Sequence, residues 1–175
     1  LTFAIVAIAL PASAENVEVA DNGSALLPIV VPVDASDGLR DSAETLAAYL
    51  QRITQAKFEI IDRNDSHGIF VGTSTSFPVA ASEGRFAPRD ITRREEYLLR
   101  SDARGLWLIG ATEAAVEHAV WDLLYRLGYR QFFPGETWEV VPVRRELAID
   151  VDVFESPDYL ARRIWYGYGA WDYNV

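Results

Sequence analysis

The densest set of residues that could contact a ligand lies at the end of the sequence. Within residues 157–175, the side chains that we expect to bind substrate are Arg163, Trp165, Tyr166, Trp171 and Asn174. Aromatic rings stack on the apolar face of a pyranose, while guanidinium and amide groups fix sugar hydroxyls or a carboxylate. The pattern predicts contact with a carbohydrate, and the alternative is an aromatic core strand followed by a linker.

A second group has the residue types of a hydrolase but not the arrangement. Asp65, Ser66 and His67 are adjacent, whereas a nucleophilic triad is brought together by the fold. A self-contained serine hydrolase is therefore the least favoured interpretation. His118 stands four residues before Asp122 on a predicted helix, which favours a solvated histidine–aspartate pair. Two isolated histidines, in a chain without cysteine, predict no metal site.

The neighbouring Glu95 and Glu96 have the residue types of an acid and a base. On a strand, consecutive side chains point to opposite faces, so these two carboxylates cannot flank one glycosidic bond. Residues 68–72 lack the third glycine and following helix of a dinucleotide motif, and they contain no Walker lysine. We therefore expect no catalytic residue in this chain and no cofactor.

Two amphipathic helices are predicted to support these residues. For the first, Asp41 is the expected N-cap, with Glu44 three residues later. Its apolar stripe comprises Ala43, Leu46, Ala47, Leu50 and Ile53. For the second, Thr112 is the expected cap and Gly128 the left-handed residue that ends it. Its stripe comprises Val116, Ala119, Val120, Leu123, Leu124 and Leu127.

The remaining segments read as short strands and loops. A hairpin is expected to join residues 17–20 to the β-branched run 29–33 across an Asp-Asn-Gly turn. Further strands are expected at 57–61, 69–71, 97–100, 106–109, 129–133 and 147–153, with a long surface loop at 73–94. Because each helix has one apolar face, the fold class is α/β (α+β): a mixed sheet with two helices packed against it.

Composition limits the classes of partner. The chain has 175 residues, of which 50% are hydrophobic, and a formal net charge of −10. That length suits one ordinary domain with its own core. The acidic balance excludes the basic face that nucleic acid or anionic lipid requires.

The first fourteen residues read as the remnant of a signal peptide. They are uncharged and apolar, and they end in Ala12-Ser13-Ala14 after Pro11, the pattern of a signal-peptidase site. The run is too short to span a bilayer comfortably, and a buried strand or helix is the alternative. We expect export to the periplasm or the extracellular space. The predicted domains are 15–156 and, after Pro157, the truncated start of a second domain at 157–175.

The order of several motifs is similar to a known family. They are residues 43–50 (AETLAAYL) leading to Ile53-Thr54, 69–72 (IFVG), 96–100 (EYLLR), 105–110 (GLWLIG), 127–130 (LGYR), 133–136 (FPGE) and Val141-Pro142. The chain resembles the N-terminal domain of bacterial α-glucuronidases and the domain preceding the barrel in β-hexosaminidases. It looks closest to large secreted proteins with an α-glucuronidase-like N-terminal domain. Gln55 and Gln131 depart from the residues usual in the family, glycine and tryptophan.

This resemblance implies an accessory domain packed on a (β/α)-barrel that hydrolyses glycosides. In such enzymes the catalytic carboxylates come from barrel strand ends, which would lie after this domain. The carbohydrate partner would then bind through the missing barrel, and residues 163–168 could line its pocket. A non-catalytic carbohydrate-binding or cell-surface scaffold module is the alternative. Few aromatic residues look exposed before Pro157, which counts against a binding platform.

Overall fold

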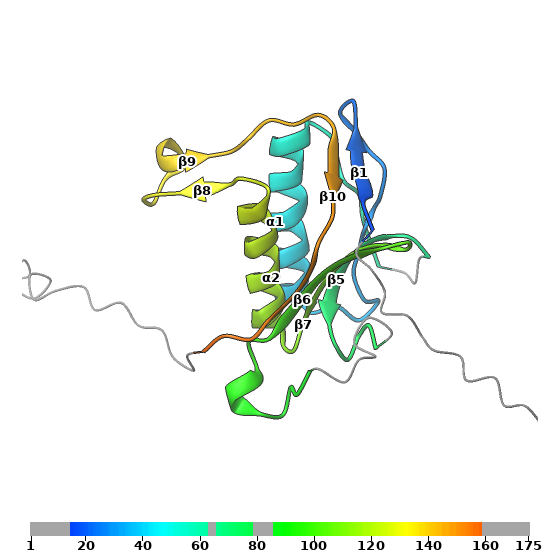
Figure 1. Ribbon diagram of the computed structural model, residues 1–175, viewed down its shortest axis with the longest axis vertical. Helices are drawn as coiled ribbons and strands as arrows, with labels where there is room; N and C mark the ends of the chain where they lie inside the picture. Colours follow the sequence, from blue (N-terminus) through cyan, green and yellow to red (C-terminus); the bar gives the residue numbers. More distant parts are fainter. Residues whose placement is uncertain (1–14, 63–65, 79–85, 159–175) are drawn as a thin grey trace, which may run out of the picture.

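The computed structural model describes residues 15–62, 66–78 and 86–158 of the chain (Figure 1). Two helices, α1 (Asp37–Thr54) and α2 (Glu113–Arg126), lie side by side on one face of a six-stranded mixed sheet. In spatial order its strands are β11 (Asp152–Glu155), β6 (Tyr97–Asp102), β7 (Gly105–Gly110), β5 (Gly68–Thr73), β3 (Ile29–Val30) and β4 (Ile60–Ile61). The predicted fold class is confirmed.

Two smaller sheets and two short helices complete the described chain. β1 (Val17–Asp21) pairs antiparallel with both β2 (Ser24–Ala25) and β10 (Leu147–Ile149). β8 (Arg130–Gln131) and β9 (Glu139–Val140) form a hairpin that stands beside the helices. The 3-10 helices are η1 (Ile91–Arg93) and η2 (Glu136–Trp138). Within the described residues, no helix combines the length and apolar character needed to cross a membrane.

Strand alternation sorts the core into two layers. Ile69, Leu106 and Leu108 belong to the cluster that packs against the helices, whereas Phe70 and Trp107 belong to the opposite face. Neighbouring side chains on a strand point to opposite faces, so both faces of the central strands are apolar. On the second face, the Phe70 and Trp107 rings stack with centroids 4.0 Å apart. This burial on both faces explains why β5 and β7 are almost continuously hydrophobic.

The second helix has the ends predicted from sequence, and the first does not. Thr112 caps α2 by accepting a hydrogen bond from the Ala115 amide, and Gly128 follows with φ of 103°. In α1 the predicted cap, Asp41, lies inside the helix. Ser36 is the N-cap instead, and its hydroxyl accepts from the Leu39 amide at 3.2 Å. An earlier side-chain cap extends α1 by more than a turn beyond the apolar stripe.

Two strand predictions are wrong, one in its pairing partner and the other in its continuity. The Asn22-Gly23 turn does close a hairpin, but it joins β1 to β2; the expected partner run contributes β3, which pairs in parallel with β4 and β5. The expected strand at 147–153 is divided between β10 and β11, which belong to different sheets. The division falls beside Val151, whose amide and carbonyl are both bound by Ser101. These hydrogen bonds hold the chain against β6 at the point where it passes from one sheet to the other.

Candidate functional site

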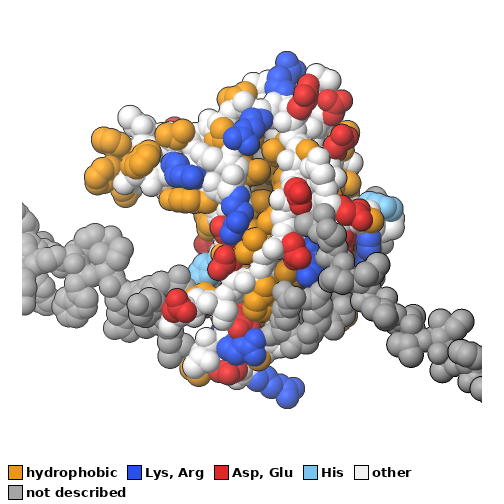
Figure 2. Space-filling model, viewed as in Figure 1, with side chains coloured by type: hydrophobic (Ala, Val, Ile, Leu, Met, Phe, Trp, Pro, Cys, Tyr) orange, Lys and Arg blue, Asp and Glu red, His pale blue; other side chains and the backbone are white. Residues whose placement is uncertain are grey.

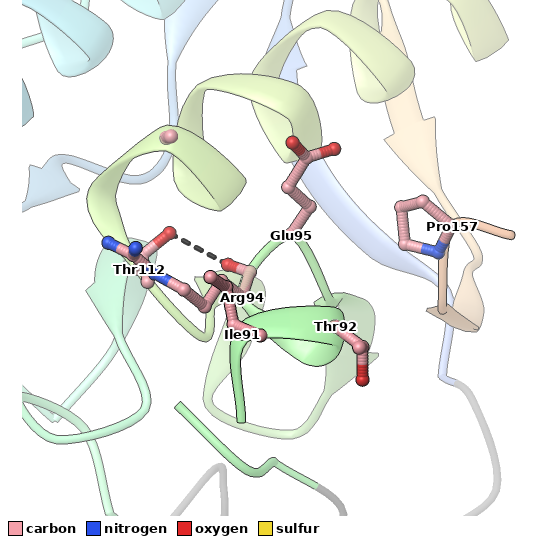
Figure 3. A pocket seen from close by; sticks show the side chains of 7 residues that line it. Ile91, Thr92, Arg94, Glu95, Thr112 and Pro157 are labelled. Atoms are coloured by element: carbon pink, nitrogen blue, oxygen red, sulfur yellow. Dashed lines mark hydrogen bonds between the residues drawn. The ribbon is translucent and has the colours of Figure 1, made fainter. Parts of the chain in front are cut away.

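A pocket of about 200 Å³ lies where the described chain approaches its C-terminal end. Figure 3 shows it between η1, the turn that follows, the N-terminal end of α2 and the segment after β11. Its lining residues are Ile91, Thr92, Arg94, Glu95, Thr112, Ala114 and Pro157.

Local hydrogen bonds hold the wall of this pocket in place. The Asp90 carboxylate accepts from both the amide and the hydroxyl of Thr92, at 2.9 and 2.7 Å, and these bonds lower the pKa of Asp90. The Thr112 hydroxyl donates to the Arg94 carbonyl at 2.8 Å (Figure 3). Because Thr112 also caps α2, the η1 turn is fastened directly to that helix.

Of the two adjacent glutamates, Glu95 lines the pocket and Glu96 does not, and they have different exposure and partners. The Glu95 side chain is 37% exposed, and its Oε2 lies 4.0 Å from Nδ1 of His118. The Glu96 side chain is only 2% exposed; its Oε1 binds the Arg93 Nε and accepts from the Ser156 hydroxyl at 3.1 Å. The two carboxylates have different partners, but both residues precede β6, so the alternation expected of neighbours on a strand does not apply to them.

This geometry limits the chemistry of the pocket. Glu95 is the one carboxylate among its lining residues, whereas a glycosidase needs two that face each other across the bond. Its volume is also below the roughly 300 Å³ at which ligand pockets begin. The pocket therefore fits a joint between segments better than a hydrolytic centre.

A second assembly of polar side chains joins the β8–β9 hairpin to the helices. Glu139 accepts hydrogen bonds from the Tyr49 hydroxyl at 2.7 Å and the Tyr129 hydroxyl at 3.1 Å. Its other oxygen lies 2.7 Å from a guanidinium nitrogen of Arg52. The Tyr49 and Arg52 hydrogen bonds lower the pKa of Glu139, and burial raises the pKa of Tyr129. The carboxylate is therefore held ionised at neutral pH.

Aromatic rings surround this carboxylate. The Tyr49 ring meets Tyr129 and Trp121 edge to face, with centroids 4.9 and 5.4 Å away. The Arg52 guanidinium lies 4.9 Å from the centre of the Tyr49 ring, a cation–π distance. The hairpin is thus attached to both helices through an ionic centre with an aromatic rim.

The far end of the same hairpin is exposed and apolar. Phe132, Phe133 and Trp138 are 67%, 61% and 51% exposed. The prediction that few aromatic residues are exposed before Pro157 is therefore wrong. Sequence reasoning missed these side chains because it treated residues 129–133 as an ordinary strand. The available signal was the adjacent pair Phe132-Phe133, since two successive side chains cannot both face one core.

The residues predicted to do chemistry are placed as follows. Arg163, Trp165, Tyr166, Trp171 and Asn174 lie outside the described residues, as do Asp65 and residues 1–14. The Ser66 hydroxyl lies 2.9 Å from Nδ1 of His67 on the surface.

The predicted pairing of His118 with Asp122 is wrong. His118 faces Glu95, and Asp122 instead binds Arg126 one helical turn further on, at 3.0 Å. Over residues 15–62, 66–78 and 86–158, no group of three histidine, aspartate or glutamate side chains is placed to hold a metal ion.

Comparison with known proteins shows a likeness in fold but none in sequence. No protein-family model matches the chain, and no curated protein matches it by sequence. A solved structure of a family GH115 4-O-methyl-α-glucuronidase with specificity for decorated arabinogalactans matches with a TM-score of 0.51 and 18% identity. The match covers 73% of this chain and 17% of that one. The chain therefore shares the fold of one part of a much longer glycoside hydrolase.

Proposed function

We propose that this chain is the N-terminal, non-catalytic accessory domain of an exported glycoside hydrolase that acts on polysaccharide. The observation that carries the proposal is the fold likeness, which takes in most of this chain but 17% of the α-glucuronidase. A small α+β unit within a long hydrolase is the arrangement expected of a supporting domain. Polysaccharide bearing uronic acid is the substrate class that we infer.

In this proposal the domain positions a catalytic unit that follows it. The chain leaves the core after β11, where Ser156 is fastened to the buried Glu96. Residues 157–175 would begin a (β/α)-barrel, and Arg163 and Trp165 would contact the sugar near its entrance. The two carboxylates that hydrolysis requires would come from barrel strands later in the chain. Residues 1–14 would direct export and be removed after Ala14.

The direct test compares two lengths of the polypeptide. Residues 15–175 are assayed on aryl glucuronides and on glucuronic-acid-bearing polysaccharide, beside the product of the complete reading frame. We expect hydrolysis only from the longer polypeptide. Robust turnover by residues 15–175 would reject the accessory role, and a reading frame without paired carboxylates would reject the hydrolase.

A carbohydrate-binding or cell-surface scaffold module is the second candidate. The exposed rings of Phe133 and Trp138 favour it, because exposed aromatic side chains can stack on sugars. Affinity electrophoresis of residues 15–175 in gels containing polysaccharide separates the two candidates. Retardation that the Trp138→Ala change removes would support the binding module, and migration unaffected by polysaccharide would support the accessory domain.

A further inference from the structure

Exposed apolar side chains are concentrated on the β8–β9 hairpin. Nine large hydrophobic residues are exposed among those that the structure describes, and four of these lie between Phe132 and Val140. Figure 2 shows them as a projection of hydrophobic side chains beside the helices. We call Phe132, Phe133, Trp138 and Val140 the apolar tip. A contiguous apolar surface of this kind on a soluble domain marks an interaction site.

The hairpin is fastened to the helices at its base although it is short. Two residues pair on each strand, which is too little for stability in water without support. The support comes from the base, where Glu139 binds Tyr49, Tyr129 and Arg52. In addition, Arg130 donates to the carbonyls of Tyr125 and Tyr129, both at 2.6 Å. The base of the hairpin is therefore bonded to α1 and to residues at and after the end of α2.

The hydrogen bonds that close the turn do not depend on the aromatic side chains of the tip. The turn is closed by the backbone: the Phe132 amide donates to the Trp138 carbonyl, and the Trp138 amide donates to the Gly135 carbonyl. Any residue with an amide would make these bonds. Phe133 and Trp138 contact each other edge to face with centroids 5.1 Å apart, and more than half of each side chain is exposed. Their apolar surface therefore calls for a partner outside the described fold.

We propose that the apolar tip is the docking surface for the polypeptide that follows Asp158, which would place a matching apolar hollow against it. In Figure 1 the hairpin projects to the left of the helices at their upper end, and the described chain ends on the left near their lower end, so the polypeptide that follows would have to extend along the helices to reach the tip. The solved relative has this fold within a chain about four times as long as this one, since 73% of this chain matches 17% of that one. The inference rests on the proposed function in one respect: it takes the chain to continue into another domain.

The chemistry of the tip favours a protein surface over a sugar. Phe132 and Val140 add exposed apolar area. A hydroxyl-rich ligand that covered this area would bury its hydroxyl groups without hydrogen bonds. The edge-to-face contact between Phe133 and Trp138 also covers part of a flat ring face that stacking on a pyranose would need. An apolar protein surface could cover all four side chains without burying hydroxyl groups and without needing a free ring face.

Hydroxyl-radical footprinting tests the proposal. Oxidation rates of Phe133 and Trp138 are measured by mass spectrometry in residues 15–175 and in the product of the complete reading frame. We expect both rings to be oxidised at least about fivefold more slowly in the longer polypeptide. Leu26, which is exposed directly after β2, is the internal control and should keep its rate. In the complete polypeptide, the double change Phe133→Ser and Trp138→Ser should increase tryptic cleavage at Arg162 and Arg163, which follow Asp158. The change Leu26→Ser should not.

Four outcomes would overturn the proposal. They are equal oxidation in the two polypeptides, a reading frame that ends at Val175, protection that grows with the concentration of residues 15–175, and protection of those residues by oligosaccharide. The third would identify a second copy of this chain as the partner, and the fourth a sugar. Hydrolase activity is measured on the same samples. A protected tip in an inactive polypeptide would reject the proposed function alone, and an exposed tip in an active one would reject the docking alone.

Discussion

Three side chains converge on Glu139, and they bind it from two different helix ends. Tyr49 and Arg52 belong to α1, while Tyr129 follows α2. Each contact favours the ionised carboxylate, which is why the pKa of Glu139 lies below its ordinary value of 4.5. A group with a lowered pKa stabilises the fold fully above its unfolded pKa and loses that contribution as pH falls through the folded value.

Replacement of Tyr49 by phenylalanine tests this cluster. The change removes the 2.7 Å hydrogen bond and keeps the ring, so we expect Tm at pH 7 to fall by about 5 °C. The difference from the parent should shrink as pH is lowered below about 4.5, because protonation of Glu139 weakens a bond that only the parent makes. Thermal unfolding followed by circular dichroism measures both effects. Tyr125→Phe, at a half-exposed position on α2, is the matched control and should change Tm by less than about 2 °C.

The adjacent Glu95 and Glu96 provide a second comparison. Glu96→Ala should destabilise the fold by about 2 kcal/mol, because it removes a buried carboxylate bound by Arg93 and Ser156. Glu95→Ala should change stability by less than about 0.5 kcal/mol, since that side chain is partly exposed. Urea unfolding measures both values. Equal effects at the two positions would contradict the division between a structural and a solvated carboxylate.

Side-chain exposure is the residue-scale property that sequence predicted least well. The stripes of both helices were predictable because helical spacing repeats over several turns. Phe132 and Trp138 offered no repeat, since Phe132 follows the two-residue strand β8 and Trp138 ends the three-residue helix η2. Whether such an aromatic side chain is buried depends on what the rest of the fold places over it. The partners of Glu139 were equally hidden, because Tyr49 is 90 residues away in the sequence.

Local signals predicted single elements and failed where distant residues compete. Thr112 and Gly128 mark the two ends of α2 through residues next to those ends. The two-residue connection between β6 and β7 is a local signal of the same kind. The β-branched run from residue 29 satisfies a hairpin and a parallel strand equally well. Contact with β5 decides the matter, and β5 lies about forty residues later.

Replacement by alanine should change the free energy of unfolding in opposite directions at two glycines, Gly110 at the end of β7 and Gly38 in the first turn of α1. A Cβ on Gly110 would come within 2.5 Å of the Val116 amide nitrogen and 2.6 Å of the Thr112 carbonyl oxygen, so β7 and α2 would have to separate. We expect Gly110→Ala to cost about 3 kcal/mol. In α1, a Cβ on Gly38 would meet one Glu113 oxygen at 3.6 Å, an ordinary contact, and Gly38→Ala should stabilise by about 0.5 kcal/mol. Urea unfolding of both variants checks the signs.

At the scale of the whole molecule, two apolar layers share one sheet. The helices complete the larger layer, and the smaller layer is built from side chains such as Phe70, Phe77 and Trp107. Sequence predicted the helical layer from its stripes. It did not predict the second layer or the strand order, because β3 and β4 are only two residues long and their neighbours are set by long-range packing. The predicted sugar-contacting residues lie outside the described chain and stay a prediction.

A shortened polypeptide tests whether these two layers suffice for folding. The described members of both clusters lie between Val17 and Phe154. Residues 15–158 alone should therefore unfold in one cooperative transition, with Tm within about 5 °C of that of the 175-residue chain. Calorimetry provides the measurement. A broad, non-cooperative transition would show that the core depends on the removed segments.

The outer strands of the central sheet have a consequence for self-association. One border, β4, has two paired residues and so offers a foreign strand very few backbone groups. The other, β11, carries Asp152 and Glu155 and is followed by Pro157, and such residues discourage strand addition. Fibril growth by edge-on stacking of copies is therefore disfavoured at both borders, and a concentrated solution of the domain should resist amyloid-like conversion.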